Sequence, residues 1–196
     1  MIPRVTLDTN CILDLEEDTP PAVAVRDLVA RHDRGSIVLS IPSIMASERQ
    51  REGVYFDDFA QFVQRLAGLG IDHLPLLPPM AYVDICFFDH SLMIDDAMES
   101  LELQVHRILH PHVEYEYADY CARHGIDPAV EPLAKAWRNR KCDVQVVWTH
   151  IHHRGDLLVT SDKNFLKASK LPHLLALGAG AIVEPEQAAA SLAPAV

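Results

Sequence analysis

Residues 4–8 read Arg-Val-Thr-Leu-Asp, and residues 157–162 read Leu-Leu-Val-Thr-Ser-Asp. Each stretch is a short apolar run that ends in an aspartate. Continuous apolar runs of this length are typical of buried strands in a parallel sheet. In such a sheet the carboxyl ends of the strands share one edge, where ligands bind. The sequence therefore predicts that Asp8 and Asp162 lie at the same edge of an α/β sheet.

Strands and helices alternate along most of the chain. Further apolar runs cover residues 37–41, 71–77 and 181–183, and helical patterns cover residues 21–32, 42–69, 142–153 and 164–169, with a last helix from residue 185. This alternation implies a mainly parallel sheet with helices on both faces. We therefore expect a single domain over residues 1–196, with a three-layer α/β/α fold and a mainly parallel sheet of four to five strands.

Residues 80–140 depart from this alternation. Apolar residues recur there at helical spacing, in segments that include residues 115–123 and 129–138. A strand at residues 82–88 stays open, because that segment combines aromatic and β-branched residues. We expect a helical elaboration of the α/β core at about residues 80–140. The pattern leaves open whether it is a substrate lid, a dimer surface or a partner dock.

The composition is ordinary for a globular protein, with 196 residues, 49% hydrophobic and 23% charged. No apolar stretch approaches the ~20 residues that span a bilayer. The N-terminus shows no secretory signal pattern, so a cytoplasmic location with no membrane association is expected. The four cysteines are far apart and form no CxxC pair, which argues against a disulfide framework and a structural zinc site.

Two further acids are expected at the edge that holds Asp8 and Asp162. Glu48 would lie on the helix after the second strand, and Asp143 would open the apolar helix of residues 142–153. Each acid alone is readily explained as a turn, surface or capping residue. Together, four carboxylates would repel one another unless a cation lay between them, and Mg²⁺ prefers such oxygen ligands. The pattern therefore indicates metal ligands in an enzyme that acts on phosphates.

The same residues resemble the motifs of PIN-domain nucleases. Residues 5–13, an apolar strand that runs into Asp-Thr-Asn, look like the first motif of that family, and Ser47-Glu48 resembles the second. Residues 142–147 are similar to the third motif and residues 157–165 to the fourth. Residues 181–186 resemble the last strand and helix, so the resemblance covers about residues 1–77 and 141–193. Asn164 departs from the pattern, because many relatives carry an acid there, and the segment between Glu48 and Asp143 is longer than in compact members.

The resemblance implies an endoribonuclease that hydrolyses RNA phosphodiester bonds with Mg²⁺ or Mn²⁺. Asp8, Glu48, Asp143 and Asp162 would be the catalytic metal ligands, and Asn10 and Thr160 would orient the carboxylates or a phosphate by hydrogen bonds. One bound ion would activate a water, and a second would stabilise the leaving oxygen. Small stand-alone members of the family are often toxins held inactive by an antitoxin, and members commonly dimerise. An antitoxin and a second copy of the chain are therefore candidate partners.

The net charge of −11 argues against a broad surface for nucleic acid. Basic residues nevertheless cluster beside each proposed ligand other than Asp8: Arg49 and Arg51; Lys135, Arg138, Arg140 and Lys141; Lys163, Lys167 and Lys170. Any one cluster is also explained as a solvated helix face.

Three other interpretations remain open. The same fold could bind RNA or protein without cutting it. His106 and His110 have the spacing to share a zinc ion on one helix face, although no third ligand at a fitting spacing is evident. A phosphohydrolase with Asp8 as nucleophile is disfavoured, because residues 8–10 lack the second aspartate that such enzymes use as acid and base.

Overall fold

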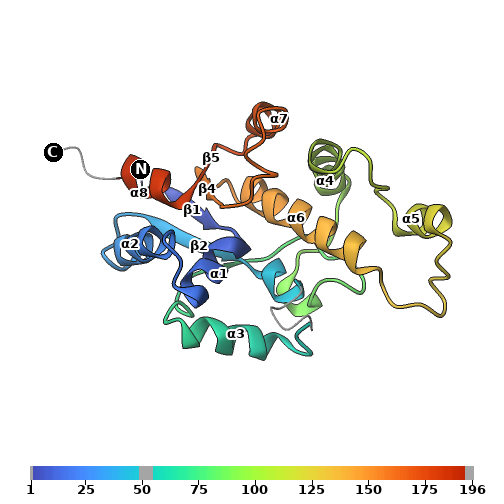
Figure 1. The fold of residues 1–196 in the computed structure, drawn as a ribbon, viewed down its shortest axis with the longest axis horizontal. Coiled ribbons are helices and arrows are strands. Elements are labelled where there is room, and N and C mark those ends of the chain that lie inside the picture. Colours follow the sequence, from blue (N-terminus) through green and yellow to red (C-terminus); the bar gives the residue numbers. More distant parts are fainter. Residues whose placement is uncertain (1, 49–54, 193–196) are drawn as a thin grey trace.

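The structure, a computed structural model, describes residues 2–48 and 55–192. In this part of the chain five strands form one sheet: β1 (Arg4–Leu7), β2 (Val38–Pro42), β3 (Leu76–Leu77), β4 (Leu157–Val159) and β5 (Ala181–Val183). The order is β3-β2-β1-β4-β5, and every neighbouring pair is parallel (Figure 1). The central strand is β1, where Val5 pairs with Leu39 on one side and Leu157 on the other. The expected parallel α/β sheet is confirmed.

Helices cover both faces of this sheet (Figure 1). One face packs against α1 (Thr9–Glu17), α2 (Ala22–Asp33), α3 (Phe59–Gly68) and α8 (Pro185–Ser191). The other packs against α4 (Asp96–Leu109), α6 (Lys135–His152) and α7 (Leu171–Ala176). Leu157 and Val159 belong to the first core and Leu158 to the second, as the two-residue period of a strand requires. The arrangement is the expected three-layer α/β/α fold.

The region predicted as an elaboration lies against α6. It contains the 3₁₀ helix η2 (Phe88–His90), α4 and α5 (Tyr117–His124), and α5 lies at the opposite end of the molecule from α8 (Figure 1). The strand left open at residues 82–88 does not form, because that segment folds into turns that lead to η2. The helical periodicity is confirmed where α4 and α5 form, whereas residues 129–134, predicted as part of a helix, form turns and loop.

Three predicted elements have different bounds in the structure. The third strand is limited to Leu76–Leu77, since residues 71–74 form a turn. The helix predicted at residues 42–69 is instead the 3₁₀ helix η1 (Ser43–Ser47) and, later, α3; residues 49–54 lie outside the described residues. The short helix predicted at residues 164–169 lies later, as α7.

The most consequential difference concerns α6. Residues 129–138 and 142–153 were predicted as two helices, with Asp143 at the start of the second. In the structure one helix begins at Lys135 and continues to His152. Arg138, Arg140 and Lys141 are good helix formers, and no glycine or proline interrupts the segment between Pro132 and Gly155. Asp143 therefore lies in the middle of α6, and its predicted capping position is wrong.

None of the helices within residues 2–48 and 55–192 has both the length and the apolar character needed to cross a bilayer.

Candidate metal centre

Asp8 follows the central strand and caps the N-terminus of α1. Its Oδ1 accepts a hydrogen bond from the backbone N–H of Thr9 at 2.8 Å. Its Oδ2 accepts from the hydroxyl of Thr160 at 2.6 Å and from the amide of Asn10 at 3.2 Å. A carboxylate at this position satisfies a free helix N–H and suits the positive end of the helix dipole. Both residues predicted as supports, Asn10 and Thr160, thus hold the same carboxylate.

Asp162 lies in the loop that follows β4. Its backbone N–H donates to Thr160 Oγ1 at 2.9 Å, and its Oδ1 accepts from the backbone N–H of Asn164 at 2.7 Å. Thr160 therefore donates to Asp8 and accepts from the loop that carries Asp162. Because β1 and β4 are neighbouring parallel strands, Asp8 and Asp162 lie at the same edge of the sheet, as the two apolar runs predicted.

Glu48 reaches this edge from β2, but not from a helix. It directly follows η1 with an extended backbone (φ −80°, ψ 155°), so its predicted helical position is wrong. Its Oε1 accepts a hydrogen bond from the hydroxyl of Thr9 at 2.7 Å. Thr9 thereby joins Glu48 to the start of α1, a role that the sequence did not indicate.

Asp143 reaches the edge from the middle of α6. This helix leads through Gly155 into β4 and runs back along the sheet, antiparallel to the strands. The helix from Asp143 to His152 is about 14 Å long at ~1.5 Å per residue. The segment from Asp156 to Thr160, which contains β4, is about 13 Å long at ~3.3 Å per residue. Because the two lengths are nearly equal, Asp143 lies beside the carboxyl end of β4. Its Oδ2 lies 3.2 Å from Nε2 of His110, the residue that directly follows α4.

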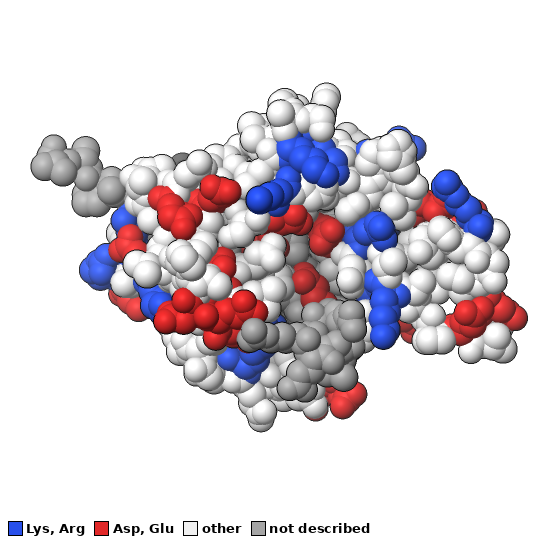
Figure 2. Space-filling view, in the orientation of Figure 1, with Lys and Arg blue, Asp and Glu red and all other residues white. Residues whose placement is uncertain are grey.

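All four predicted carboxylates line one pocket. This acidic pocket has a volume of about 180 Å³ and is lined by Asp8, Thr9, Asn10, Leu13, Glu48, Arg65, Asp143 and Asp162. Acidic side chains are visible in the hollow at the centre of the face shown in Figure 2. The structure thus brings together four acids that are far apart in the sequence.

Burial and mutual repulsion raise the pKa of three of these carboxyl groups. For Asp8 the pKa rises to about 7, chiefly because the group is buried, and the charges of Asp143 and Asp162 add to the rise. Burial also raises the pKa of Glu48, with Asp8 as the next cause. The pKa of Asp143 is raised by burial and by Asp162, against the lowering effect of His110. A cation in the pocket would relieve this repulsion.

The chemistry of the pocket fits a hard divalent ion. Four carboxylates and the amide of Asn10 offer oxygen ligands of the kind that Mg²⁺ and Mn²⁺ prefer. Among the described residues, no group of three or more His, Cys, Asp or Glu side chains is arranged to hold an ion as it stands. An ion shared by the four acids would therefore draw their side chains inward from the pocket wall.

Besides Thr9, two residues at the site carried no clear signal in the sequence. Arg65 of α3 lines the acidic pocket, and its guanidinium pairs with Glu16 through contacts of 2.5 and 2.8 Å. His110 was considered only as a zinc partner of His106. In the structure Nε2 of His106 is hydrogen-bonded to the carbonyl of Val113 at 2.8 Å, and His110 contacts Asp143. The two histidines therefore serve different partners.

One residue of the predicted basic clusters is not a surface cation. Lys141 is buried, and its Nζ lies 2.8 Å from Oε1 of Glu102, a buried acid on α4. The ring of Tyr115 lies 4.1 Å from the same ammonium group. Sequence alone placed Lys141 with its charged neighbours, because the partner acid belongs to another helix.

Comparison with models of known protein families finds no match for this chain, and comparison with curated proteins also finds none.

Proposed function

We propose that this protein is a metal-dependent endoribonuclease that hydrolyses RNA phosphodiester bonds in the acidic pocket. The observation that supports this most strongly is the convergence of Asp8, Glu48, Asp143 and Asp162 on one pocket. A cluster of partly buried carboxylates destabilises a fold unless it serves a ligand, and the raised pKa values of Asp8, Glu48 and Asp143 express that cost. The resemblance of the same four positions to PIN-domain motifs supports the choice of RNA as substrate.

The side chains of the acidic pocket would act either as metal ligands or as supports that hold those ligands. The four carboxylates would hold Mg²⁺ or Mn²⁺, which when bound supplies an activated water and stabilises charge on the phosphate. Thr160 and Asn10 hold Oδ2 of Asp8, and Thr9 holds Oε1 of Glu48. Such hydrogen bonds fix the direction in which each carboxylate presents its free lone pairs.

Cleavage of a labelled RNA tests the proposal. Purified protein is incubated with an unstructured and a hairpin RNA in Mg²⁺ or Mn²⁺, with EDTA as the metal-free arm. The wild type is expected to cut internal bonds only with metal. Asp8→Asn is expected to lower the rate by roughly 100-fold or more, since loss of a mere supporting partner already costs about 10–100-fold. Asp119→Asn, an exposed acid on α5, is the matched control and should cut like the wild type.

Two outcomes contradict the proposal. Equal cleavage by the wild type and Asp8→Asn would mean that the pocket is not the site of the reaction. Failure of the folded protein to cut either RNA under any metal condition would contradict the nuclease activity itself.

A further inference from the structure

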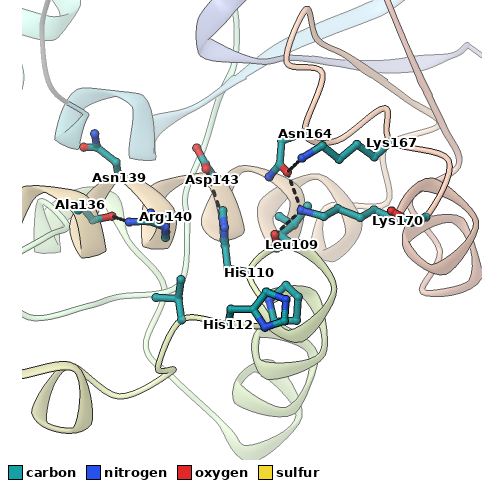
Figure 3. Close-up of a pocket in the computed structure, with 13 residues that line it drawn as sticks. Leu109, His110, His112, Ala136, Asn139, Arg140, Asp143, Asn164, Lys167 and Lys170 are labelled. Carbon is teal, nitrogen blue, oxygen red and sulfur yellow. Dashed lines mark hydrogen bonds and ion pairs between the residues drawn. The ribbon is translucent and has the colours of Figure 1, made fainter. Parts of the chain in front are cut away.

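A second, larger cavity lies beside the acidic pocket. It has a volume of about 860 Å³ and is formed by the end of α4, the first half of α6 and the segment between β4 and α7 (Figure 3). We call it the basic groove. Asp143 lines both the basic groove and the acidic pocket. A ligand that fills the groove can therefore extend past Asp143 to the other carboxylates.

The charge of the groove opposes that of the whole chain. The chain has 28 acidic and 17 basic residues. The described lining of the groove instead carries Arg140, Lys167 and Lys170 against the single acid Asp143. In Figure 2 basic side chains border the acidic hollow above it and to its right. Three cations are thus gathered beside the pocket that holds the four carboxylates and one cation, Arg65, and this favours an anionic ligand in the groove.

Local contacts hold these cations on two sides of Asp143. Arg140 and Asp143 are three residues apart on α6, so they project from the same face of the helix. On the other side, Nζ of Lys170 donates to the side chain of Asn164 and to the carbonyl of Leu109, both at 2.5 Å. Figure 3 shows Arg140 to one side of Asp143 and Asn164 to the other.

Lys167 belongs to the second of these groups. Its Nζ lies 3.3 Å from the side-chain oxygen of Asn164, and the residue is exposed. Asn164 occupies the position where many PIN-domain nucleases carry an acid, and in this chain it accepts from two lysines. The amide oxygen thus orders two ammonium groups without neutralising their charge, which leaves both available to an anion.

We propose that the basic groove binds the sugar–phosphate backbone of a single RNA strand and leads the adjoining phosphodiester bond into the acidic pocket. This inference rests on the proposed nuclease function. A polymeric anion can contact Arg140 and the lysines and at the same time pass Asp143, because all of them line the same groove. The volume of the groove lies in the upper part of the ~300–1,000 Å³ range of ligand sites, and exposed His112 on its wall offers a ring on which a base can stack.

Binding in the absence of metal tests the groove without any need for cleavage. A fluorescein-labelled, unstructured ten-nucleotide RNA is titrated in EDTA and followed by anisotropy. Lys167→Gln and Arg140→Gln are each expected to weaken binding about fivefold or more and to reduce the salt dependence by about 0.7 per lost phosphate contact. Arg34→Gln removes the same charge from an exposed residue at the end of α2, on the other face of the sheet, and should bind like the wild type.

Cleavage kinetics separate the groove from the nuclease site. The two groove variants should raise KM and leave kcat within about twofold, because they remove binding contacts outside the reaction site. Asp8→Asn should bind the labelled RNA normally and fail to cut it. If the groove variants bind RNA more weakly but neither they nor the wild type cut it, RNA binding by the basic groove would be supported and the nuclease activity would be contradicted.

Three results would contradict the proposal that the basic groove binds RNA. The first is unchanged RNA affinity in Lys167→Gln and Arg140→Gln. The second is an equal loss in the Arg34→Gln control, which would indicate unspecific attraction. The third is displacement of the RNA by polyglutamate at an equal concentration of charge, which would point to an acidic peptide as the ligand.

Discussion

The hydroxyl of Thr160 donates a 2.6 Å hydrogen bond to Oδ2 of Asp8, and this contact joins the ends of two neighbouring strands. Both residues are buried, so the hydrogen bond stabilises a carboxylate that burial otherwise disfavours. The same hydroxyl accepts from the backbone of Asp162. One small side chain therefore orders two of the four proposed ligands.

Replacement of Thr160 by valine should destabilise the metal-free protein. The variant leaves Oδ2 of Asp8 and the N–H of Asp162 without this partner, at a cost of about 1–3 kcal/mol in the free energy of unfolding. Thr149→Val is the matched control, because the hydroxyl of Thr149 is also buried but has no hydrogen-bond partner among the described residues. Urea unfolding in EDTA measures both variants, and equal losses of stability would contradict the role of the Thr160 hydroxyl.

The buried carboxyl of Asp8 should make the metal-free protein less stable as the pH rises. Its pKa is about 7 in the folded protein and 3.8 in its ordinary environment. The folded state therefore binds the proton on Asp8 more tightly than the unfolded state does. The stabilisation that results is complete below about pH 4 and is lost above about pH 7. A shift of this size corresponds to roughly 4 kcal/mol. The amide in the Asp8→Asn variant cannot ionise, so the variant should gain stability relative to the wild type as the pH rises across this range. The free energy of unfolding of both proteins is measured against pH in EDTA, and parallel curves would exclude the effect.

The buried pair of Lys141 and Glu102 joins α6 to α4, the two helices that form one end of the basic groove. Lys141→Met leaves Glu102 buried without its counter-charge and is expected to cost about 3–5 kcal/mol. The double variant Lys141→Met/Glu102→Leu should regain most of that loss, since it removes both charges from the interior. Denaturant unfolding of the two single variants and the double variant completes the cycle. Additive losses would mean that the two charges do not interact.

His150 should remain neutral in the folded protein until the pH is well below 6. Its ring lies between the hydroxyl of Thr6 at 2.8 Å and the carbonyl of Ala179 at 2.9 Å, and burial lowers its pKa to about 4. Because the folded pKa is below the unfolded one, stability is complete above about pH 6.5 and falls toward pH 4, by roughly 3 kcal/mol. An NMR titration of the imidazole C–H signal measures this pKa directly. A midpoint near 6.5 would contradict the buried, neutral ring.

Much of the sheet was predictable from the sequence. The first and last strands have the predicted bounds, because both segments contain the β-branched and apolar residues that a strand favours. The third strand, β3, covers only Leu76–Leu77, whereas the apolar pattern predicted a strand at residues 71–77. Pro75 and Pro78 flank the two residues that pair, and proline cannot donate to a ladder.

The candidate site was predictable where it depends on strand ends and not where it depends on helix packing. Asp8 directly follows β1 and Asp162 lies three residues after the end of the neighbouring β4, so the topology alone brings them together. Asp143 lies at the expected edge, but its position within the helix could not be predicted, because that depends on where α6 begins. The contact with His110 and the burial of Lys141 depend on how α4 packs against α6, and local periodicity carries no information about that packing.

The central claim is that Asp8, Glu48, Asp143 and Asp162 share a divalent cation. Electron paramagnetic resonance of free Mn²⁺, titrated with metal-free protein, tests it most directly. The wild type is expected to remove at least one Mn²⁺ per chain from the free signal, and Mg²⁺ should displace it. Asp119→Asn should behave like the wild type, whereas Asp8→Asn/Asp143→Asn should leave the signal unchanged. Equal uptake of Mn²⁺ by the double variant, or no uptake by the wild type, would contradict the account.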